Sequence, residues 1–214
     1  MNSTRIIAIR HGETAWNVDA RIQGQLDIPL NDTGRWQAQQ LARALAEREP
    51  IDVIYASDLL RAWETASAIS AATGAPLHAH TGLRERGFGL FQGRTFAEVE
   101  HTHPEDARRW RKRDPHWAPP EGGESLVAMR NRIDATLHVL AAAHPGQLIA
   151  LVAHGGVMDL LYRSATRQDL QAPRTWQLGN TAINRLLWTP QGLTLVGWSD
   201  TSHLHQNSRD ETSA

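Results

Sequence analysis

Apolar and polar residues alternate along the chain in two distinct rhythms. Short, unbroken apolar runs such as Ile6–Ile9 are typical of strands that a sheet buries on both faces. Runs of this kind and two later segments, joined by a turn at residues 190–192, predict strands. The predicted strands are residues 6–9, 51–56, 148–152, 182–188 and 193–198.

Three stretches between the strands repeat an apolar residue every three or four positions, which is the period of a helix with one buried face. Their apolar positions are Ala38, Leu41, Ala42 and Leu45; Leu59, Ala62, Ala66 and Ile69; and Leu126, Met129, Ile133, Leu137 and Leu140. Asn31 is predicted to cap the first helix, with Asp32 in its first turn, and Ser57 or Asp58 to cap the second.

Two segments lack a clear period. Residues 83–125 are rich in Gly, Pro, Arg and His, and they predict loops and short helices. The end of the chain, residues 206–214, is polar and predicts a flexible tail. We therefore expect one domain over residues 1–205, followed by this tail.

Strands that alternate with helices predict an α/β fold with three layers, α/β/α, in which helices cover both faces of a largely parallel central sheet. Ligands bind such sheets outside the carboxyl ends of the strands. Three predicted strands end in charged or histidine-bearing segments, at residues 10–12, 57–61 and 154–156. If these strands are neighbours, one pocket holds two arginines and two histidines, which suits a small dianion.

Composition and charge exclude several classes of protein. The 214 residues include 22 Lys and Arg and 23 Asp and Glu, for a net charge of −1, which argues against a nucleic-acid partner. No cysteine is present, which excludes disulfides, thiolate metal sites and a cysteine nucleophile. The apolar run at residues 6–9 is too short for a signal-peptide core or a membrane span. We therefore expect a cytoplasmic protein with no membrane partner.

Two further clusters resemble sites but have simpler interpretations. The histidine pairs at residues 101–103 and 203–205 lack a carboxylate or a third histidine at supporting spacing, so no metal is expected. The basic cluster at residues 108–113 is interpreted as a solvated helix face rather than a nucleic-acid patch, because the overall charge is close to zero.

The segment Arg10-His11-Gly12-Glu13-Thr14 resembles the signature of the histidine phosphatase superfamily, which is also called phosphoglycerate-mutase-like. The similarity continues in order along residues 5 to about 204. The other matching positions are Asn17, Gln23-Gly24, Asp27-Ile28-Pro29-Leu30, Gly34 with Gln37-Ala38, Ser57-Asp58-Leu59-Leu60-Arg61-Ala62 with Thr65-Ala66, Leu83-Arg84-Glu85 with Gly89 and Gly93, Gly123-Glu124-Ser125, and His154-Gly155-Gly156. The resemblance implies the phosphoglycerate-mutase-like form of the three-layer fold.

The resemblance also implies a role for each matching residue. His11 would be the nucleophile and would form a phosphohistidine, with Arg10, Arg61 and His154 around the phosphoryl group. Glu85 would give a proton to the leaving group and then activate water. The remaining positions expected beside the phosphate are Asn17, Gln23, Gly24 and Gly155.

These residue types suit phosphoryl transfer, which mainly requires positioning and positive charge around the transferred group. Two arginines can each bind two phosphate oxygens, so neither a metal nor a cofactor is expected. His11 must be neutral to attack. We therefore expect its other ring nitrogen to donate to a backbone carbonyl, and the neighbouring arginines to favour the neutral ring.

Two departures separate this chain from the mutases it resembles. The stretch from Gly93 to Gly123 is short where the mutases carry a longer insertion. His154 is followed by Gly155-Gly156-Val157-Met158 rather than by Gly-Asn-Ser-Leu-Arg. We therefore expect a metal-independent phosphomonoester hydrolase that acts on a small phosphorylated metabolite. The alternatives are a 2,3-bisphosphoglycerate-dependent phosphoglycerate mutase and a non-catalytic module that binds phosphoryl ligands.

The resemblance leaves three points open. Residues 108–113 lie where the family places a lid over the pocket, so one of their arginines is an alternative contact for the far end of the substrate. His203 is an alternative neighbour of the site mouth, because the ending at residues 200–204 recurs in the family. A homodimer is common among such proteins, but the sequence indicates no interface.

Overall fold

The computed structural model describes residues 3–205, and the predicted tail at residues 206–214 lies outside them. The strands are β1 (Thr4–Arg10), β2 (Val53–Ala56), β3 (Leu77–Ala79), β4 (Leu148–Ala153), β5 (Ile183–Thr189) and β6 (Gly192–Asp200). The helices are α1 (Ala15–Val18), α2 (Asp32–Arg48), α3 (Leu60–Thr73), α4 (Phe96–Thr102), α5 (Pro104–Arg111), α6 (Leu126–Ala142) and α7 (Gly155–Thr166). Short 3₁₀ turns lie at η1 (Thr81–Leu83), η2 (Gly89–Phe91) and η3 (Ser202–Leu204).

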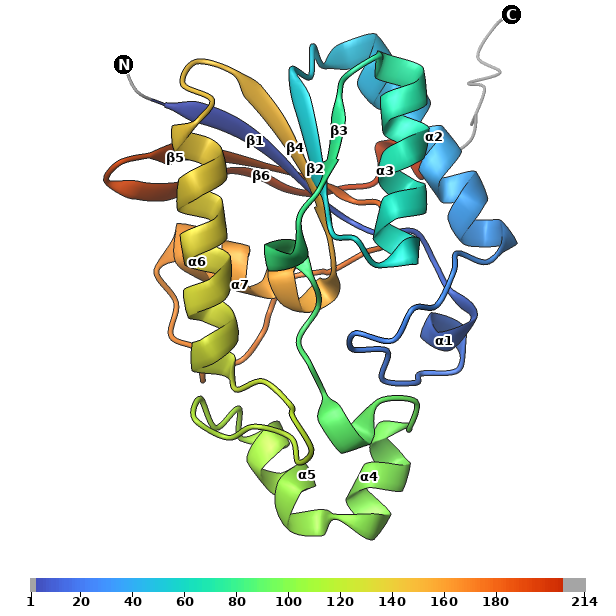
Figure 1. Cartoon of the computed structure of the whole chain (residues 1–214), viewed down its shortest axis with the longest axis vertical. Helices are drawn as coiled ribbons and strands as arrows, with labels where there is room; N and C mark the ends of the chain where they lie inside the picture. Colours follow the sequence, from blue (N-terminus) through green and yellow to red (C-terminus); the bar gives the residue numbers. More distant parts are fainter. Residues whose placement is uncertain (1–2, 206–214) are drawn as a thin grey trace, which may run out of the picture.

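The strands form one mixed sheet in the order β3-β2-β4-β1-β5-β6. The first four are parallel, and β5 and β6 extend the sheet as an antiparallel hairpin. The predicted α/β fold with a largely parallel sheet and helices on both faces is confirmed (Figure 1). The sequence pattern does not predict β3, because this edge strand has only three residues and its side chains are half-buried or exposed.

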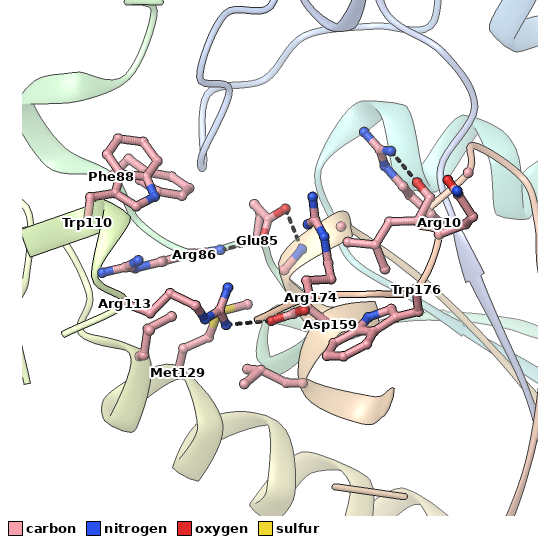
Figure 2. A pocket seen from close by; sticks show the side chains of 17 residues that line it. Arg10, Glu85, Arg86, Phe88, Trp110, Arg113, Met129, Asp159, Arg174 and Trp176 are labelled. Atoms are coloured by element: carbon pink, nitrogen blue, oxygen red, sulfur yellow. Dashed lines mark hydrogen bonds and ion pairs between the residues drawn. The ribbon is translucent and has the colours of Figure 1, made fainter. Parts of the chain in front are cut away.

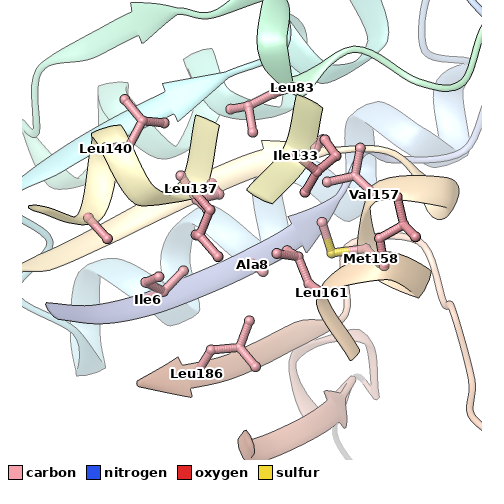
Figure 3. Close-up of a cluster of buried hydrophobic side chains, with 14 of the residues drawn as sticks. Ile6, Ala8, Leu83, Ile133, Leu137, Leu140, Val157, Met158, Leu161 and Leu186 are labelled. Carbon is pink, nitrogen blue, oxygen red and sulfur yellow. The ribbon is translucent and has the colours of Figure 1, made fainter. Parts of the chain in front are cut away.

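Helices α6 and α7 cover one face of the sheet, and α2 and α3 cover the other (Figure 1). Ile6 and Ala8 of β1 join the cluster beneath α6 and α7 (Figure 3). Ile7 and Ile9 of the same strand join the cluster beneath α2 and α3. Because both faces of β1 are buried, its sequence is continuously apolar instead of alternating.

The beginnings of α2 and α3 differ in how well the sequence predicts them. The predicted cap of α2 is confirmed, because the Asn31 side chain accepts from a first-turn amide. The prediction that Ser57 or Asp58 caps α3 is wrong. The helix begins at Leu60, whose amide donates to Asp27 Oδ1 at 2.6 Å. Because Asp27 lies 33 residues earlier in the chain, a local pattern does not indicate this cap.

Residues 84–125 form the segment between η1 and α6, and they carry α4 and α5 away from the sheet (Figure 1). The loops and short helices predicted there are confirmed. This α4–α5 segment has a small core of its own, made of Phe91, Val99, Ala107 and Trp117. In the described part of the chain, no helix has both the length and the apolar character needed to cross a membrane.

Candidate active site

The carboxyl ends of β1, β2 and β4 meet at one edge of the sheet. β4 pairs with β1 on one side and with β2 on the other, both in parallel. His11 follows β1, Ser57 follows β2 and His154 follows β4. The ring centroids of the two histidines lie 5.2 Å apart. The sheet therefore brings together residues that are more than 140 positions apart in the sequence.

His11 is held as a neutral ring with one free nitrogen. Its Nδ1 lies 2.7 Å from the Gly12 carbonyl oxygen, and because a carbonyl only accepts, Nδ1 carries the proton and Nε2 the free lone pair. Burial lowers the pKa of His11 well below its usual value, and Arg10 and Arg61 lower it further. Each of these effects disfavours an additional buried positive charge.

The backbone around His11 is fixed from several sides. The Gly12 amide donates to Thr65 Oγ1 at 3.1 Å, and the Asn180 side chain donates to the His11 carbonyl at 2.8 Å. A Cβ at Gly12 would lie 2.5 Å from the Gly34 carbonyl oxygen. Glycine at this position therefore lets the loop pack directly against the start of α2.

Arg61 and Arg10 each keep part of the guanidinium free. Arg61, only 1% exposed, donates from Nη1 and Nη2 to the carbonyls of Leu26 and Gly24 at 2.8 and 2.7 Å. Arg10 donates from Nη1 to the Leu178 carbonyl. The Nε atoms of both arginines are buried and have no partner within residues 3–205. Burial lowers the pKa of Arg61 to about 10, so it stays charged at neutral pH.

His154 is completely buried at the start of α7. Its Nε2 lies 2.8 Å from Ser57 Oγ, and its Nδ1 has no partner in the described chain. Burial lowers the pKa of His154 well below its usual value, with a further contribution from Arg61. Ser57 Oγ also accepts from the Leu59 amide at 3.3 Å, which leaves the hydroxyl proton for His154.

Glu85 reaches the site from the loop between η1 and η2. Its Oε1 accepts from the Arg86 amide at 2.8 Å, and its Oε2 accepts from the Gly156 amide at 3.0 Å. Gly156 is the second residue of α7, and helix N-termini favour anions. A Cβ at Gly156 would lie 2.3 Å from Glu85 Oε1. The second glycine after His154 therefore makes room for the Glu85 carboxylate.

The two arginines that flank Glu85 have other partners. Arg84 forms two hydrogen bonds to the Asp58 carboxylate, at 2.7 and 2.5 Å. The Arg86 side chain extends into the α4–α5 segment (Figure 2), where it donates to the carbonyls of Glu124 and Trp117 at 2.7 and 3.2 Å. Burial lowers the pKa of Arg86 to about 10.

Arg132 of α6 fixes the backbone that leads to Glu85. Its Nη1 donates to the carbonyls of Gly82 and Arg84, at 2.9 Å each. Its other nitrogens bind the Glu124 carboxylate at 2.9 and 2.7 Å. Arg132 therefore joins α6 to the loop on which Glu85 is carried.

Of the positions expected around the phosphate, Arg10 and Gly155 line the cavity that opens beside Glu85. The other five lie outside its lining: Asn17, Gln23, Gly24, Arg61 and His154. Asn17 Oδ1 accepts from the amide and the hydroxyl of Thr14, at 3.0 and 3.1 Å. Gln23 is buried, and its Oε1 has no partner within residues 3–205. Gly24 has a positive φ of 53° and supplies a carbonyl to Arg61.

A cavity of about 540 Å³ opens beside Arg10 and Glu85 (Figure 2). Phe88 and Trp110, whose ring centroids are 4.9 Å apart, stack on one wall. The other walls are formed by Arg86 of the η1–η2 loop and by residues between α5 and α6, of α6, of α7 and of the loop after α7: Arg113, Leu126, Met129, Asp159, Leu160, Arg174, Trp176, Gln177, Leu178 and Gly179.

The basic cluster at residues 108–113 divides into two groups. Three of its arginines are exposed and form ion pairs, as the solvated-face interpretation predicts: Arg108 with Glu105, Arg109 with Asp114, and Arg111 with Glu100. Arg113 instead lines the cavity and donates to Asp159 at 2.7 Å. Arg113 is therefore the arginine of this cluster that is placed to contact the far end of a substrate.

The histidine pairs lie away from the cavity lining. Within residues 3–205, no three His, Asp or Glu side chains gather closely enough to hold a metal ion. His203 Nε2 lies 3.4 Å from Thr181 Oγ1. The Thr181 amide in turn donates to the Arg10 carbonyl at 2.9 Å, so Thr181 links His203 to the site.

Several residues of the site are not among those expected from the sequence. Ser57 stands at a strand end within a matching motif, and that position is the signal that could have identified it. Asp159 lies in α7, where a single carboxylate carries no pattern. Arg174 and Trp176 lie in a loop without periodicity. The fold alone brings the last three to the cavity.

Comparison with known proteins gives a consistent assignment. The family model described as histidine phosphatase superfamily (branch 1) matches residues 6–201. Phosphoglycerate mutase-like protein 4 of Arabidopsis thaliana is 37% identical over 94% of this chain and 87% of its own length. The metal-independent phosphoserine phosphatase of the same plant is 35% identical over 94% and 83%. The solved structure of a mycobacterial glucosyl-3-phosphoglycerate phosphatase has a TM-score of 0.80 and 33% identity, covering 93% of this chain and 100% of that one.

Proposed function

Since the chain belongs to the histidine phosphatase superfamily, we propose that this phosphoric monoester hydrolase works through a phosphohistidine on His11. One observation carries the proposal: a neutral, fixed His11 ring lies with His154 and two partly unpaired arginines at one edge of the sheet. The relatives named as phosphatases support a small phosphorylated metabolite as substrate.

In the first step, the phosphoryl group binds to the free N–H groups of Arg10 and Arg61 and to His154 Nδ1. The His11 Nε2 lone pair attacks phosphorus, and the bond between phosphorus and the ester oxygen breaks. Glu85, protonated, gives its proton to the departing oxygen. The positive groups offset the charge spread over the phosphoryl oxygens in the transition state.

In the second step, the Glu85 carboxylate takes a proton from water. The water oxygen attacks phosphorus while the bond from phosphorus to His11 Nε2 breaks. The step releases inorganic phosphate and restores neutral His11 and protonated Glu85. The amides of Arg86 and Gly156 hold the carboxylate in place through both steps.

Ser57 is proposed to set the tautomer of His154. Its hydroxyl proton, donated to His154 Nε2, leaves the ring proton on Nδ1, where it can be donated to a phosphate oxygen. Asn17, Gln23, Gly24 and Gly155 stay proposed neighbours of the phosphate. The support for Gly24 is the hydrogen bond by which its carbonyl orients Arg61.

The setting of the enzyme is also a proposal. We propose a domain over residues 1–205, supported by the family match to residues 6–201, and an enzyme that acts in the cytoplasm without metal or cofactor. The metal-independent relative supports the last point. A homodimer is proposed as well, and size-exclusion chromatography with light scattering tests it.

The test of the mechanism is phosphate release in the presence of EDTA. We expect the purified protein to hydrolyse p-nitrophenyl phosphate and 3-phosphoglycerate, and His11→Ala to reduce release to background. Glu85→Gln should slow hydrolysis of 3-phosphoglycerate by about 10²–10⁴-fold, the usual contribution of a general acid. Rapid quenching at alkaline pH, followed by mass spectrometry, should find the phosphoryl group on the peptide that contains His11. Undiminished turnover by His11→Ala would exclude the mechanism.

A mutase is the second candidate, because a relative that covers most of the chain is named phosphoglycerate mutase-like. The same incubation decides the matter when 2,3-bisphosphoglycerate is added and 2-phosphoglycerate is measured beside free phosphate. We expect free phosphate and no 2-phosphoglycerate. Isomerisation with little phosphate would make the protein a mutase.

A further inference from the structure

The proposed mechanism uses only the end of the cavity at Arg10 and Glu85. The opposite end is formed by α7, by the loop after it and by one arginine of the α4–α5 segment. Figure 2 shows Asp159 between Arg113 and Trp176, with Arg174 nearby. Three features of this far end together indicate which chemical groups a ligand there would carry.

The first feature is a buried carboxylate with one oxygen unused. Asp159 is 5% exposed, and its Oδ2 accepts from Arg113 at 2.7 Å and from Arg163 at 3.0 Å. Its Oδ1 has no hydrogen-bond partner within residues 3–205. Buried polar atoms in folded proteins nearly always have a partner, so this oxygen calls for a donor.

The second feature is a buried donor in the same cavity wall. Trp176 is 8% exposed, and its indole Nε1 has no acceptor in the described chain. The ring cannot easily turn away, because it stacks on Tyr162 at 4.1 Å and the Arg163 guanidinium lies 4.8 Å from its centre. A hydroxyl group that donates to Asp159 and accepts from Trp176 would satisfy both orphaned atoms.

The third feature is excess positive charge. Asp159 already binds both Arg113 and Arg163, so one negative charge faces two positive ones. Arg174 lines the same cavity and adds a third. Because three arginines face one carboxylate, the complementary ligand group is an anion, and a planar carboxylate matches the guanidinium fork.

The helix α7 sets the size of the ligand. Gly156 and Asp159 are three residues apart, so they lie on one face of the helix about 5 Å from each other. The Gly156 amide holds Glu85, the proposed proton donor to the leaving oxygen. A substrate group that contacts Asp159 is therefore separated from the ester oxygen by only a few bonds, which indicates a small leaving group.

We infer that the far end of the cavity binds the leaving group of a small phosphorylated carboxylic acid. Arg174 binds the carboxylate, and Asp159 Oδ1 accepts from a hydroxyl or ammonium group on the neighbouring carbon. Where that group is a hydroxyl, its oxygen also accepts from Trp176 Nε1. The inference rests on the proposed function, because it describes the alcohol that the phosphatase releases. A neutral leaving group would leave the excess positive charge of this end uncompensated.

Matched pairs of phosphomonoesters test the inference. Phosphoserine is compared with phosphoethanolamine, which lacks the carboxylate, and 3-phosphoglycerate with glycerol 3-phosphate. We expect kcat/KM to be at least tenfold higher for the carboxylated member of each pair. Equal values within threefold in both pairs would overturn the inference.

Variants test which residues cause the preference for carboxylated substrates. Arg174→Gln should lower kcat/KM for the carboxylated substrates about tenfold and change that for glycerol 3-phosphate less than twofold, while Arg174→Lys should restore part of the loss. Trp176→Phe keeps the ring and removes the donor, and should raise KM for 3-phosphoglycerate more than it lowers kcat. The matched control is Arg111→Gln, an exposed arginine of the α4–α5 segment paired with Glu100, which should leave all constants unchanged. Equal losses on both members of a pair in Arg174→Gln would contradict the assignment.

A binding measurement separates this inference from the mechanism. Calorimetry on His11→Ala measures affinity without turnover, and we expect tighter binding of phosphoserine than of phosphoethanolamine. If no ester is hydrolysed by the wild-type protein while this preference is present, the proposed function fails, and only the carboxylate-binding role of the far end is supported. If p-nitrophenyl phosphate is hydrolysed and no preference is found by either method, the inference fails alone.

Discussion

At the scale of single residues, Glu85, the proposed proton donor, is positioned by a glycine that has no side chain. Gly156 gives its amide to Glu85 and leaves the space that a Cβ would occupy, 2.3 Å from Glu85 Oε1. At this distance the two groups cannot coexist, so a methyl group at residue 156 must displace the Glu85 carboxylate. The backbone at this position is helical, so alanine fits the local conformation. Its Cβ clashes with Glu85 and lies 3.1 Å from Met129 Cε, the end of a flexible side chain.

Gly156→Ala is therefore expected to lower kcat on 3-phosphoglycerate by about 10²-fold or more, the scale at which a general acid contributes. KM should change little, because the phosphate contacts of Arg10 and Arg61 are not touched. Steady-state kinetics measure the effect, and circular dichroism checks that the fold is kept.

A double-mutant cycle gives the control for Gly156→Ala. In the background of Glu85→Ala, the added methyl group meets no carboxylate, so it should cost less than threefold in kcat. A loss that is equally large in both backgrounds would show that the methyl group disturbs α7 rather than Glu85.

At the scale of elements, the loop that bears Glu85 has little regular structure and depends on α6 for its position. Arg132 binds the carbonyl of Arg84 in this loop and that of Gly82 in η1, and its own position is fixed by Glu124. Arg132 touches no substrate in the proposed mechanism, so it is a positioning residue. If Arg132 acts by positioning Glu85, its effect on kcat should be larger for substrates whose leaving oxygen needs a proton.

Arg132→Gln is expected to lower kcat about tenfold on glycerol 3-phosphate, whose alkoxide leaving group requires the proton of Glu85. With p-nitrophenyl phosphate, whose phenolate leaves more readily, the loss should be less than threefold. Kinetics on the two substrates give the ratio directly. The same loss on both substrates would mean that Arg132 affects the fold of the site and not the acid.

The elements also show how far sequence reasoning extends. The apolar run of β1 and the stripe of α6 each follow from a buried face, so pattern alone predicts them. The cap of α3 by Asp27 and the placement of Arg174 depend on contacts between distant segments, which no local pattern contains. Motif order indicates His11, Arg61, Glu85 and His154 as candidate site residues, whereas the far end of the cavity follows only from the fold.

At the scale of the whole molecule, two neutral histidines buried side by side couple stability to pH. The pKa values of His11 and His154 are held well below the usual value, first of all by burial. The unfolded chain takes up protons at these residues below about pH 6.5, and the folded chain does not. The folded state therefore loses stability as the pH falls below about 6.5, and the loss is absent above about pH 7.5.

The expected slope below pH 6 is up to about 1.4 kcal/mol of unfolding free energy per pH unit for each of the two histidines. Urea unfolding at pH 7.5, 6.5 and 5.5 measures it. His154→Gln should remove the part of the slope that His154 contributes, which is about half of the part due to the two histidines. The exposed control His101→Gln should leave the slope unchanged. An unchanged slope in His154→Gln would contradict the coupling.

The position of β1 has a consequence for the order in which the chain is made. β1 lies at the centre of the sheet, between β4 and β5, and its pairing partners begin at Leu148 and Ile183. During synthesis, the apolar segment of β1 therefore stays without pairing partners on either edge while more than a hundred further residues are added. Open strand edges pair readily with other chains. Nascent chains that end before β4 should be the form of this protein that depends most on chaperones, and they lack His154 altogether.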